Sequence, residues 1–248
     1  MDVTELVRHI EDTYTRKVVL IYLRGSRMRG LHSANSDFDI TALISPSIKE
    51  VLTGEKYSRR LQLPELNVEG NITTIPHFYT LLLKGSPNTI EMIFAKPIYV
   101  ETSCQELATF LYGCRTELIQ SRQLDFISSS TRMIRNNLQK SKALTYDNTE
   151  SIRRRIMYAK LALLQCDVVA KGGNLDFCVP LESSMKNYVL NIDENSLPLE
   201  IDGISTQLKE KEKLWVNIKT QGTSSDLIFK KLEKLIFETI YKINEEIT

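Results

Sequence analysis

Short apolar runs separated by polar, turn-rich stretches fill the first hundred residues of the chain. Val18–Leu23 and Phe38–Ile44 are apolar runs of strand length, and Leu66–Ile75 places its apolar residues on one parity. Thr89–Phe94 is predicted as a fourth strand. Prolines beside these runs fit short elements joined by turns. The pattern predicts a layer that contains a β-sheet.

From about residue 101 onward, apolar positions recur at helical spacing. Amphipathic helices are predicted over residues 124–138, 152–170 and 228–247. The change of period divides the chain into a sheet-containing domain at 1–100 and a helical domain at 101–248. We therefore predict an α+β fold, in which a short mixed β-sheet domain is followed by a helical domain.

Composition narrows the class of protein. The 248 residues carry a net charge of +1 and are 42% hydrophobic, which argues against disorder and against a basic coat for nucleic acid. The longest apolar runs are far shorter than the roughly 20 residues of a membrane helix, and the N-terminal residues lack an apolar signal core. We expect a soluble, cytoplasmic protein without a membrane partner.

The four cysteines do not form a closely spaced pair, and only three histidines are present. That pattern argues against a disulfide framework and against a structural zinc site. We expect the cysteines to be small buried side chains, and we expect any metal to be bound by oxygen.

The strongest chemical signal lies between the first two predicted strands. Asp37 and Asp39 are two residues apart on a predicted strand, so both carboxylates project from one face. Two adjacent carboxylates repel each other unless a cation lies between them. An oxygen-only pair suits Mg²⁺ or Mn²⁺, which complete their coordination with water and substrate phosphates. The pair therefore predicts phosphoryl-transfer chemistry.

The residues before this pair fit the same chemistry. Gly25 at a strand end allows backbone N–H groups to approach an anion, and the Ser26 hydroxyl can donate to a phosphate oxygen. Arg27 and Arg29 supply positive charge beside the same phosphates. His32, in the same loop, either touches phosphate or is simply exposed.

These residues resemble the DNA polymerase β-like nucleotidyltransferase superfamily, in which Gly-Ser at a strand end precedes Asp-x-Asp on the next strand. The longer form G-S-R-x-x-G…S-D-x-D resembles a bacterial and phage branch linked to RNA repair. A second stretch, residues 77–91, resembles the branch segment K-F…L-L-L-K-G-N-P-x-x-L-E, with His77 and Ser86 as departures. The residues that match the longer form are Gly25, Ser26, Arg27, Gly30, Ser36, Asp37 and Asp39.

The resemblance implies a third carboxylate on a neighbouring strand, which completes a two-metal site and helps to activate the attacking hydroxyl. Glu69 and Glu91 compete for this role, and we favour Glu69. A glutamate is a departure, because many relatives use aspartate. The implied metal ligands are thus Asp37, Asp39 and Glu69, and Gly25, Ser26, Arg27 and Ser36 are candidate nucleotide-binding residues.

A basic stretch in the helical half adds candidates. Residues 121–160 hold nine Lys or Arg and three acids, a balance of +6. Arg132 and Arg135 share one helical face, and Arg153 and Lys160 share another. We expect this stretch to face the cleft, and we expect phosphate or acceptor to be contacted by Arg132, Arg135, Arg153 and Lys160. The alternative is a solvated helix face.

Together these features predict a metal-dependent nucleotidyltransferase that moves a nucleoside monophosphate from an NTP to an acceptor hydroxyl. The resemblance and the basic stretch favour an RNA end, such as damaged tRNA, as the acceptor. Two alternatives remain open. One is transfer to a protein or a small molecule, and the other is a non-catalytic nucleotide-binding or antitoxin-like protein.

Overall fold

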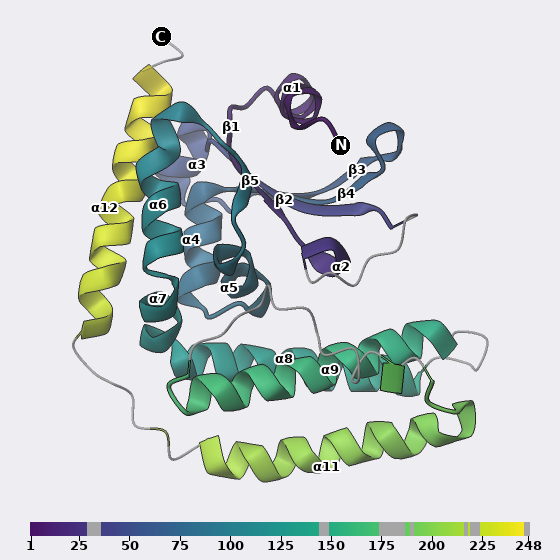
Figure 1. Cartoon of the computed structure of the whole chain (residues 1–248). Coiled ribbons are helices and arrows are strands. Elements are labelled where there is room, and N and C mark those ends of the chain that lie inside the picture. Colours follow the sequence, from purple (N-terminus) through teal and green to yellow (C-terminus); the bar gives the residue numbers. More distant parts are fainter. Residues whose placement is uncertain are drawn as a thin grey trace.

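The computed structural model of the chain is shown in Figure 1. It describes residues 1–28, 36–143, 149–173, 187–188, 191–215, 218 and 224–245. The predicted α+β class is confirmed, because a five-stranded mixed sheet is combined with many helices. No helix in the described residues is long and apolar enough to span a bilayer.

The sheet has the strand order β3-β4-β2-β1-β5. Its central pair, β2 and β4, is parallel, and all other neighbouring strands are antiparallel. The three predicted strands at its centre are therefore confirmed. The strand bounds are Val18–Leu23 (β1), Phe38–Ile44 (β2), Ser58–Leu63 (β3), Val68–Thr74 (β4) and Pro97–Val100 (β5).

Helices cover both faces of the sheet. Helix α1 packs on one face through Leu6, Val7 and Ile10, and the cluster around Phe78 fills the other face. The first-half helices are α1 (Val3–Tyr14), α2 (Gly25–Met28), α3 (Ile48–Thr53), α4 (Ile75–Leu83) and α5 (Pro87–Phe94).

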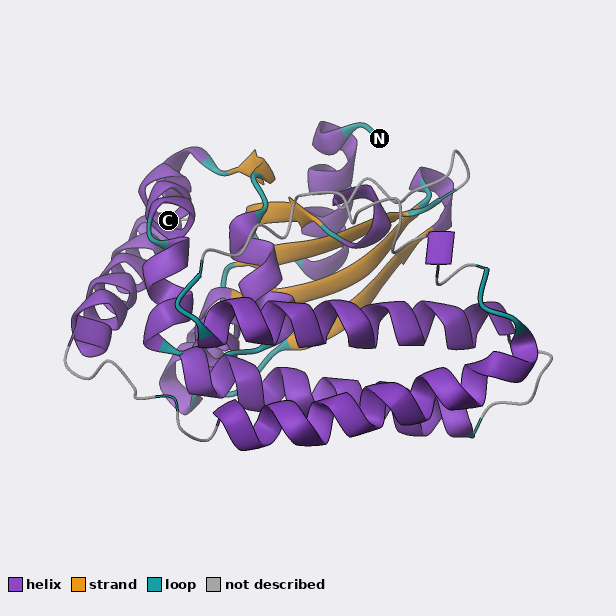
Figure 2. Ribbon diagram, turned by 60° about the horizontal axis from the view of Figure 1, so that its bottom comes forward, coloured by secondary structure: helices purple, strands orange, loops and turns teal. Residues whose placement is uncertain are grey.

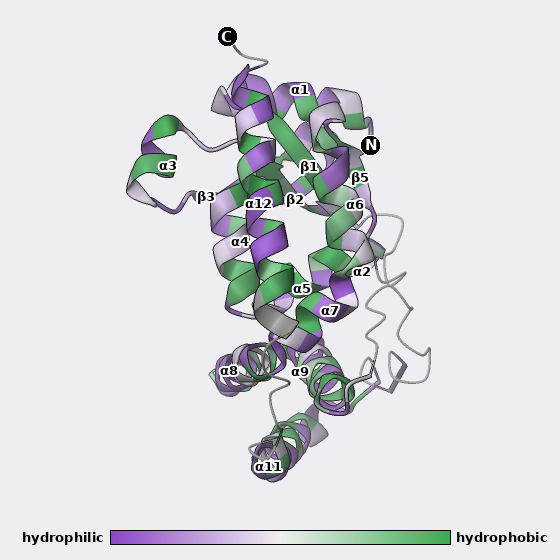
Figure 3. Cartoon of the chain, turned by 90° about the vertical axis from the view of Figure 1, so that its left-hand side faces the viewer, coloured by the Kyte–Doolittle hydropathy of each residue, from purple (hydrophilic) through white to green (hydrophobic). Residues whose placement is uncertain are grey.

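The second half is helical, as predicted, and it forms two groups. Helices α8, α9 and α11 run alongside one another beneath the sheet (Figures 1 and 2), while α12 returns to pack beside α6 and α4. Figure 3 shows the first group end-on, with α8 and α9 nearest the sheet-containing body. The helices are α6 (Gln105–Gly113), α7 (Arg115–Ser121), α8 (Gln123–Lys142), α9 (Thr149–Ala170), α11 (Leu197–Trp215) and α12 (Ser224–Glu245).

One predicted strand is wrong. Thr89–Phe94 lies in α5, which begins with Pro87 in its first turn, a position that favours helix. All six residues of the run are buried, so its apolar pattern carries no period that distinguishes helix from strand. The outer strand on this side is β5, which follows the helix. Strand β3, a polar edge strand with four exposed residues, was also missed.

The segment at residues 77–91 joins the two halves. Gly85 follows α4 with φ +58°, and a Cβ there would lie 2.3 Å from the backbone nitrogen of Phe126. Only glycine therefore allows this turn to approach the start of α8 so closely. Ser129 of α8 also donates to the carbonyl of Lys84 at 2.9 Å. The turn thus holds α8 against the sheet-containing half.

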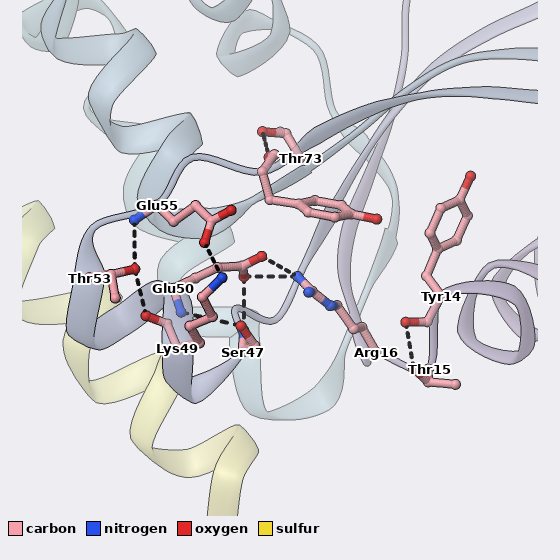
Figure 4. A network of polar contacts seen from close by, with 10 residues as sticks. Tyr14, Thr15, Arg16, Ser47, Lys49, Glu50, Thr53, Glu55 and Thr73 are labelled. Atoms are coloured by element: carbon pink, nitrogen blue, oxygen red, sulfur yellow. Dashed lines mark hydrogen bonds and ion pairs between the residues drawn. The ribbon is translucent and has the colours of Figure 1, made fainter.

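A polar network fixes the start of β1 against α3 (Figure 4). Arg16 donates to both carboxylate oxygens of Glu50, at 3.0 and 2.8 Å. Glu50 also accepts from the backbone of Ser47, whose hydroxyl accepts from the backbone of Glu50 in return, which makes a capping box. The Arg16 guanidinium lies 4.4 Å from the ring centre of Tyr57. The buried charge of Glu50 is thereby paired and hydrogen-bonded.

Candidate functional site

Three acidic side chains meet at the ends of the two parallel strands. Asp37 immediately precedes β2, Asp39 lies in β2, and Glu69 of β4 is the register partner of Asp39. In a parallel pair, register partners project from the same face of the sheet. One oxygen from each of the three carboxylates lies within 4.8 Å of the other two. The structure thus brings together the three acids proposed from the sequence as metal ligands.

The electrostatics of this triad favour a cation. Asp39 is half-buried, and burial, followed by the charges of Asp37 and Glu69, raises its pKa above the usual value. Arg24 acts in the opposite direction on the same pKa. Like charges this close repel each other, and either a bound proton or a cation relieves the repulsion. An all-oxygen donor set of this kind fits Mg²⁺ or Mn²⁺.

Glu69 is partly exposed, with 39% of its side chain accessible. Its Oε2 atom lies 3.1 Å from Nη2 of Arg60, which belongs to the edge strand β3. The ion pair uses one carboxylate oxygen, so the other oxygen remains available to a ligand.

Gly25 lies directly against the triad. It has φ +64°, and a Cβ at this position would lie 2.1 Å from Oδ2 of Asp39. The backbone nitrogen of the preceding Arg24 donates to the carbonyl of Asp39 at 2.7 Å. The glycine predicted from the motif is therefore required by the close approach of its backbone to the Asp39 carboxylate. Ser26 follows it in the short helix α2.

Arg27 is engaged with its own chain. Its Nε donates to the carbonyl of Asp37 at 3.0 Å, and Nη2 donates to the carbonyl of Ser36. The guanidinium also lies 3.8 Å from the ring centre of Phe38. These contacts fix the chain that carries Asp37, so Arg27 has a positioning role here. The predicted contributions of Arg29, Gly30 and His32 lie outside the described residues.

A cavity of about 310 Å³ opens beside the triad. Arg24, Gly25 and Asp39 line its sheet side, and α8 and α9 form the facing wall. Residues 121–160 were expected to face the cleft through their basic side chains, but other residues of α8 and α9 form this wall, because packing decides which helix face meets the sheet. They are Met133, Asn137, Tyr158, Leu161, Ala162 and Gln165.

Glu91, the competing third carboxylate, lies on a helix and not on a strand. It is buried in α5 and lines the cavity, and its charge contributes to the raised pKa of Asp39. Among the described residues, the acids close enough to share a metal ion are Asp37, Asp39 and Glu69, and Glu91 is not one of them.

The two predicted arginines of α8 lie away from this cavity. Met133 and Asn137 line the cavity, whereas Arg132 and Arg135 line a separate hollow between α8 and α11. Residues 133 and 135 are about 200° apart around a helix of 3.6 residues per turn, so they face opposite sides. Arg135 forms an ion pair with Glu212 of α11. The structure therefore does not bring these arginines to the acidic triad.

Lys160 and Arg153 of α9 also contact the α11 side. Lys160 lies 2.7 Å from Oε2 of Glu200 and 4.4 Å from the ring centre of Tyr188. Arg153 donates to the carbonyl of Ile192 at 2.7 and 3.1 Å. These side chains hold α11 and the preceding turn against α9, and the structure does not bring them to the triad.

No protein-family model matches the chain, and neither does any curated protein. Among solved structures, the chain is similar to a nucleotidyltransferase-like protein from Exiguobacterium sibiricum 255-15. The two share 15% identity with a TM-score of 0.33, over 99% of this chain and 79% of the other. Because that likeness is weak, we base the proposed function on the geometry of the site.

Proposed function

We propose that the protein is a metal-dependent nucleotidyltransferase, which transfers a nucleoside monophosphate from an NTP to the hydroxyl of an acceptor. One observation carries the proposal. Three carboxylates from β4 and from β2 and its preceding residue converge, and one of them, Asp39, lies against Gly25 and lines a cavity of about 310 Å³. Acidic clusters are common on protein surfaces, but this one lies beside a cavity large enough for a small ligand.

Each residue has a role in this proposal. Asp37, Asp39 and Glu69 hold Mg²⁺ or Mn²⁺, which when bound supplies positive charge to the triphosphate. The backbone at Gly25 and the hydroxyl of Ser26 donate to the outer phosphates. Arg27 keeps Asp37 in place through its carbonyl contacts. Arg132, Arg135 and Lys160 are not assigned to the nucleotide, because their contacts lie on the α11 side.

The reaction is an in-line substitution at the α-phosphorus. The acceptor oxygen forms a bond to that phosphorus, and the bond to the bridging oxygen of the β-phosphate breaks. Pyrophosphate leaves with the bonding electron pair, and the hydroxyl proton passes to a carboxylate of the triad. Glu69 is our candidate acceptor of the proton, because its ion pair with Arg60 uses only one of its two carboxylate oxygens.

An RNA end is the acceptor we favour, on the strength of the resemblance of the Gly25–Asp39 motif to a branch linked to RNA repair. RNA would contact the protein through several phosphates, so its binding should weaken steeply with salt. Flat salt dependence, together with no labelled product from a total-RNA pool, would favour a protein or small-molecule acceptor instead.

Labelling with each α-³²P-NTP in the presence of Mg²⁺ or Mn²⁺ tests the activity. The wild type should release pyrophosphate and label an acceptor, and Asp37→Asn with Asp39→Asn should abolish labelling. Asp12→Asn, an exposed aspartate of α1, is the matched control and should leave labelling unchanged. Undiminished labelling by the double variant would exclude this site. Binding of NTP without turnover on any acceptor would favour a nucleotide sensor.

A further inference from the structure

We infer that the outer face of α12 is an interface through which two copies of the chain pair as a symmetric dimer. The helix lies at the outer edge of the molecule (Figure 1), and no described element packs on the side that faces the viewer in Figure 3. No residue of α12 is among the described residues that line the cavity beside the acidic triad. The inference therefore stands independently of the proposed function.

Both faces of α12 carry large apolar side chains, but only the inner face is covered. The inner face packs on α4, α6 and α7 through Ile228, Phe229, Leu232, Ile236 and Ile243. On the outer face, Phe237 is 71% exposed and Tyr241 is 58% exposed. Residues four apart are neighbours on a helix surface, so the two rings form one patch. Aromatic side chains are enriched at protein–protein interfaces relative to the rest of the surface.

Charged side chains share the outer face with this aromatic patch. Lys230 and Lys234 precede the two rings, whereas Glu238 and Glu245 lie beside and after them. With 3.6 residues per turn, these four charges and the two rings all point within about 50° of one direction. Within one copy, Nζ of Lys234 lies 3.6 Å from Oε1 of Glu238. The outer face is thus positive in its first half and negative in its second half.

This distribution of charge is complementary to itself in an antiparallel pair. A two-fold axis beside Phe237 places Lys230 of each copy opposite Glu245 of the other copy. The same axis places Lys234 opposite the ring of Tyr241, which is a cation–π arrangement. A parallel pair would instead place like charges opposite each other. The face therefore fits a second copy better than it fits a partner of one charge sign, such as nucleic acid.

The length of α12 sets the strength expected of the dimer. Its 22 residues span about 33 Å. A strip of that length and about one helix in width buries on the order of 500 Å² per copy, less than the roughly 800 Å² of a standard interface. We therefore expect association in the micromolar range, which depends on protein concentration.

Sedimentation equilibrium between about 1 and about 200 μM tests the dimer. The wild type should convert from monomer to dimer over this range. Phe237→Glu should raise the dissociation constant at least about tenfold, because it removes the ring and places acids against one another at the axis. Leu214→Glu on α11 is the matched control, because Leu214 is also 71% exposed, and it should leave the dimer unchanged.

Two results would overturn the dimer, namely a wild type that stays monomeric and a dimer that Phe237→Glu does not weaken. A monomeric wild type that loses affinity for fluorescein-labelled RNA on the same substitution would assign the face to nucleic acid instead.

Exchange of two charges tests the antiparallel arrangement. Lys230→Glu and Glu245→Lys each place like charges opposite each other at two symmetric positions, so each should weaken the dimer about fivefold. The double variant restores opposite charges across the axis and should recover most of the wild-type affinity. A double variant weaker than either single variant would overturn the arrangement. All of the substituted side chains are exposed, so each variant should fold, which circular dichroism checks.

Discussion

Replacement of Gly25 by alanine tests whether the glycine shapes the acidic triad. The new Cβ would lie 2.1 Å from Oδ2 of Asp39, whereas ordinary contacts begin at 3.4 Å. The carboxylate must therefore move by about 1.3 Å, or the loop must shift by a similar amount. Displacement of a reacting group by about 1 Å can cost on the order of 100-fold in rate.

A second glycine provides the control for backbone strain. Gly54 has φ +67°, close to the +64° of Gly25, but a Cβ there would meet nothing within 4 Å. A left-handed conformation costs an L-residue about 1–2 kcal/mol, so both alanine variants should lose at least that much stability. Only Gly25→Ala should also disturb the triad, because only its Cβ meets a carboxylate.

Two measurements distinguish these effects. Urea denaturation gives the free energy of unfolding of each variant, and electron paramagnetic resonance of free Mn²⁺ gives the affinity for metal. We expect Gly25→Ala to weaken Mn²⁺ binding at least about tenfold, and Gly54→Ala to leave it unchanged. Equal Mn²⁺ affinities of the two variants would refute the reasoning that Gly25 sets the position of Asp39.

Three further predictions concern Arg27, the two arginines of α8 and the pKa of Asp39. Arg27→Leu removes donors to two backbone carbonyls, so it should lower the free energy of unfolding in urea by about 2 kcal/mol and weaken Mn²⁺ binding. Full retention of metal affinity would contradict the positioning role. Arg132→Gln with Arg135→Gln should leave the Michaelis constant for NTP unchanged, and a marked rise would show that α8 presents these residues to the cavity. The raised pKa of Asp39 means that the metal-free folded state holds its proton more tightly than the unfolded chain. The free energy of unfolding in EDTA should therefore fall as pH rises above 3.8 and through the raised pKa of Asp39. Denaturation measured as a function of pH should show a smaller decline for Asp39→Asn. An equal decline in the variant would show that another group causes it.

Local sequence was sufficient for much of the fold. The runs at β1 and β2 are apolar and of strand length, and these two neighbours in sequence pair directly, in antiparallel orientation. The pairing brings Gly25 and Asp39 together, because Leu23 of β1 is the register partner of Ile40 of β2. The long helices α8, α9 and α12 were predictable from their spacing of apolar residues. These features depend on contacts between residues that are close in sequence.

One predicted strand was wrong and one strand was not predicted, in both cases where the pattern of apolar residues carried little information. The run Thr89–Phe94 is buried on all sides, so burial removed the helical period that would have identified α5. Strand β3 is exposed on most positions and has no apolar pattern of its own. It forms because β4 offers its free edge, which is a tertiary contact.

The tertiary structure decided how the site is assembled. The parallel register of β2 and β4 aligns Asp39 with Glu69, and no local pattern encodes the register of two strands that are separated by other elements. The same holds for α8, whose sequence shows which residues are polar but not which neighbour each face meets. Packing turned Asn137 toward the cavity and Arg135 toward α11. Sequence specified the chemistry of the motif, and long-range packing determined which other side chains surround it, because helix faces and strand registers are selected by partners distant in the chain.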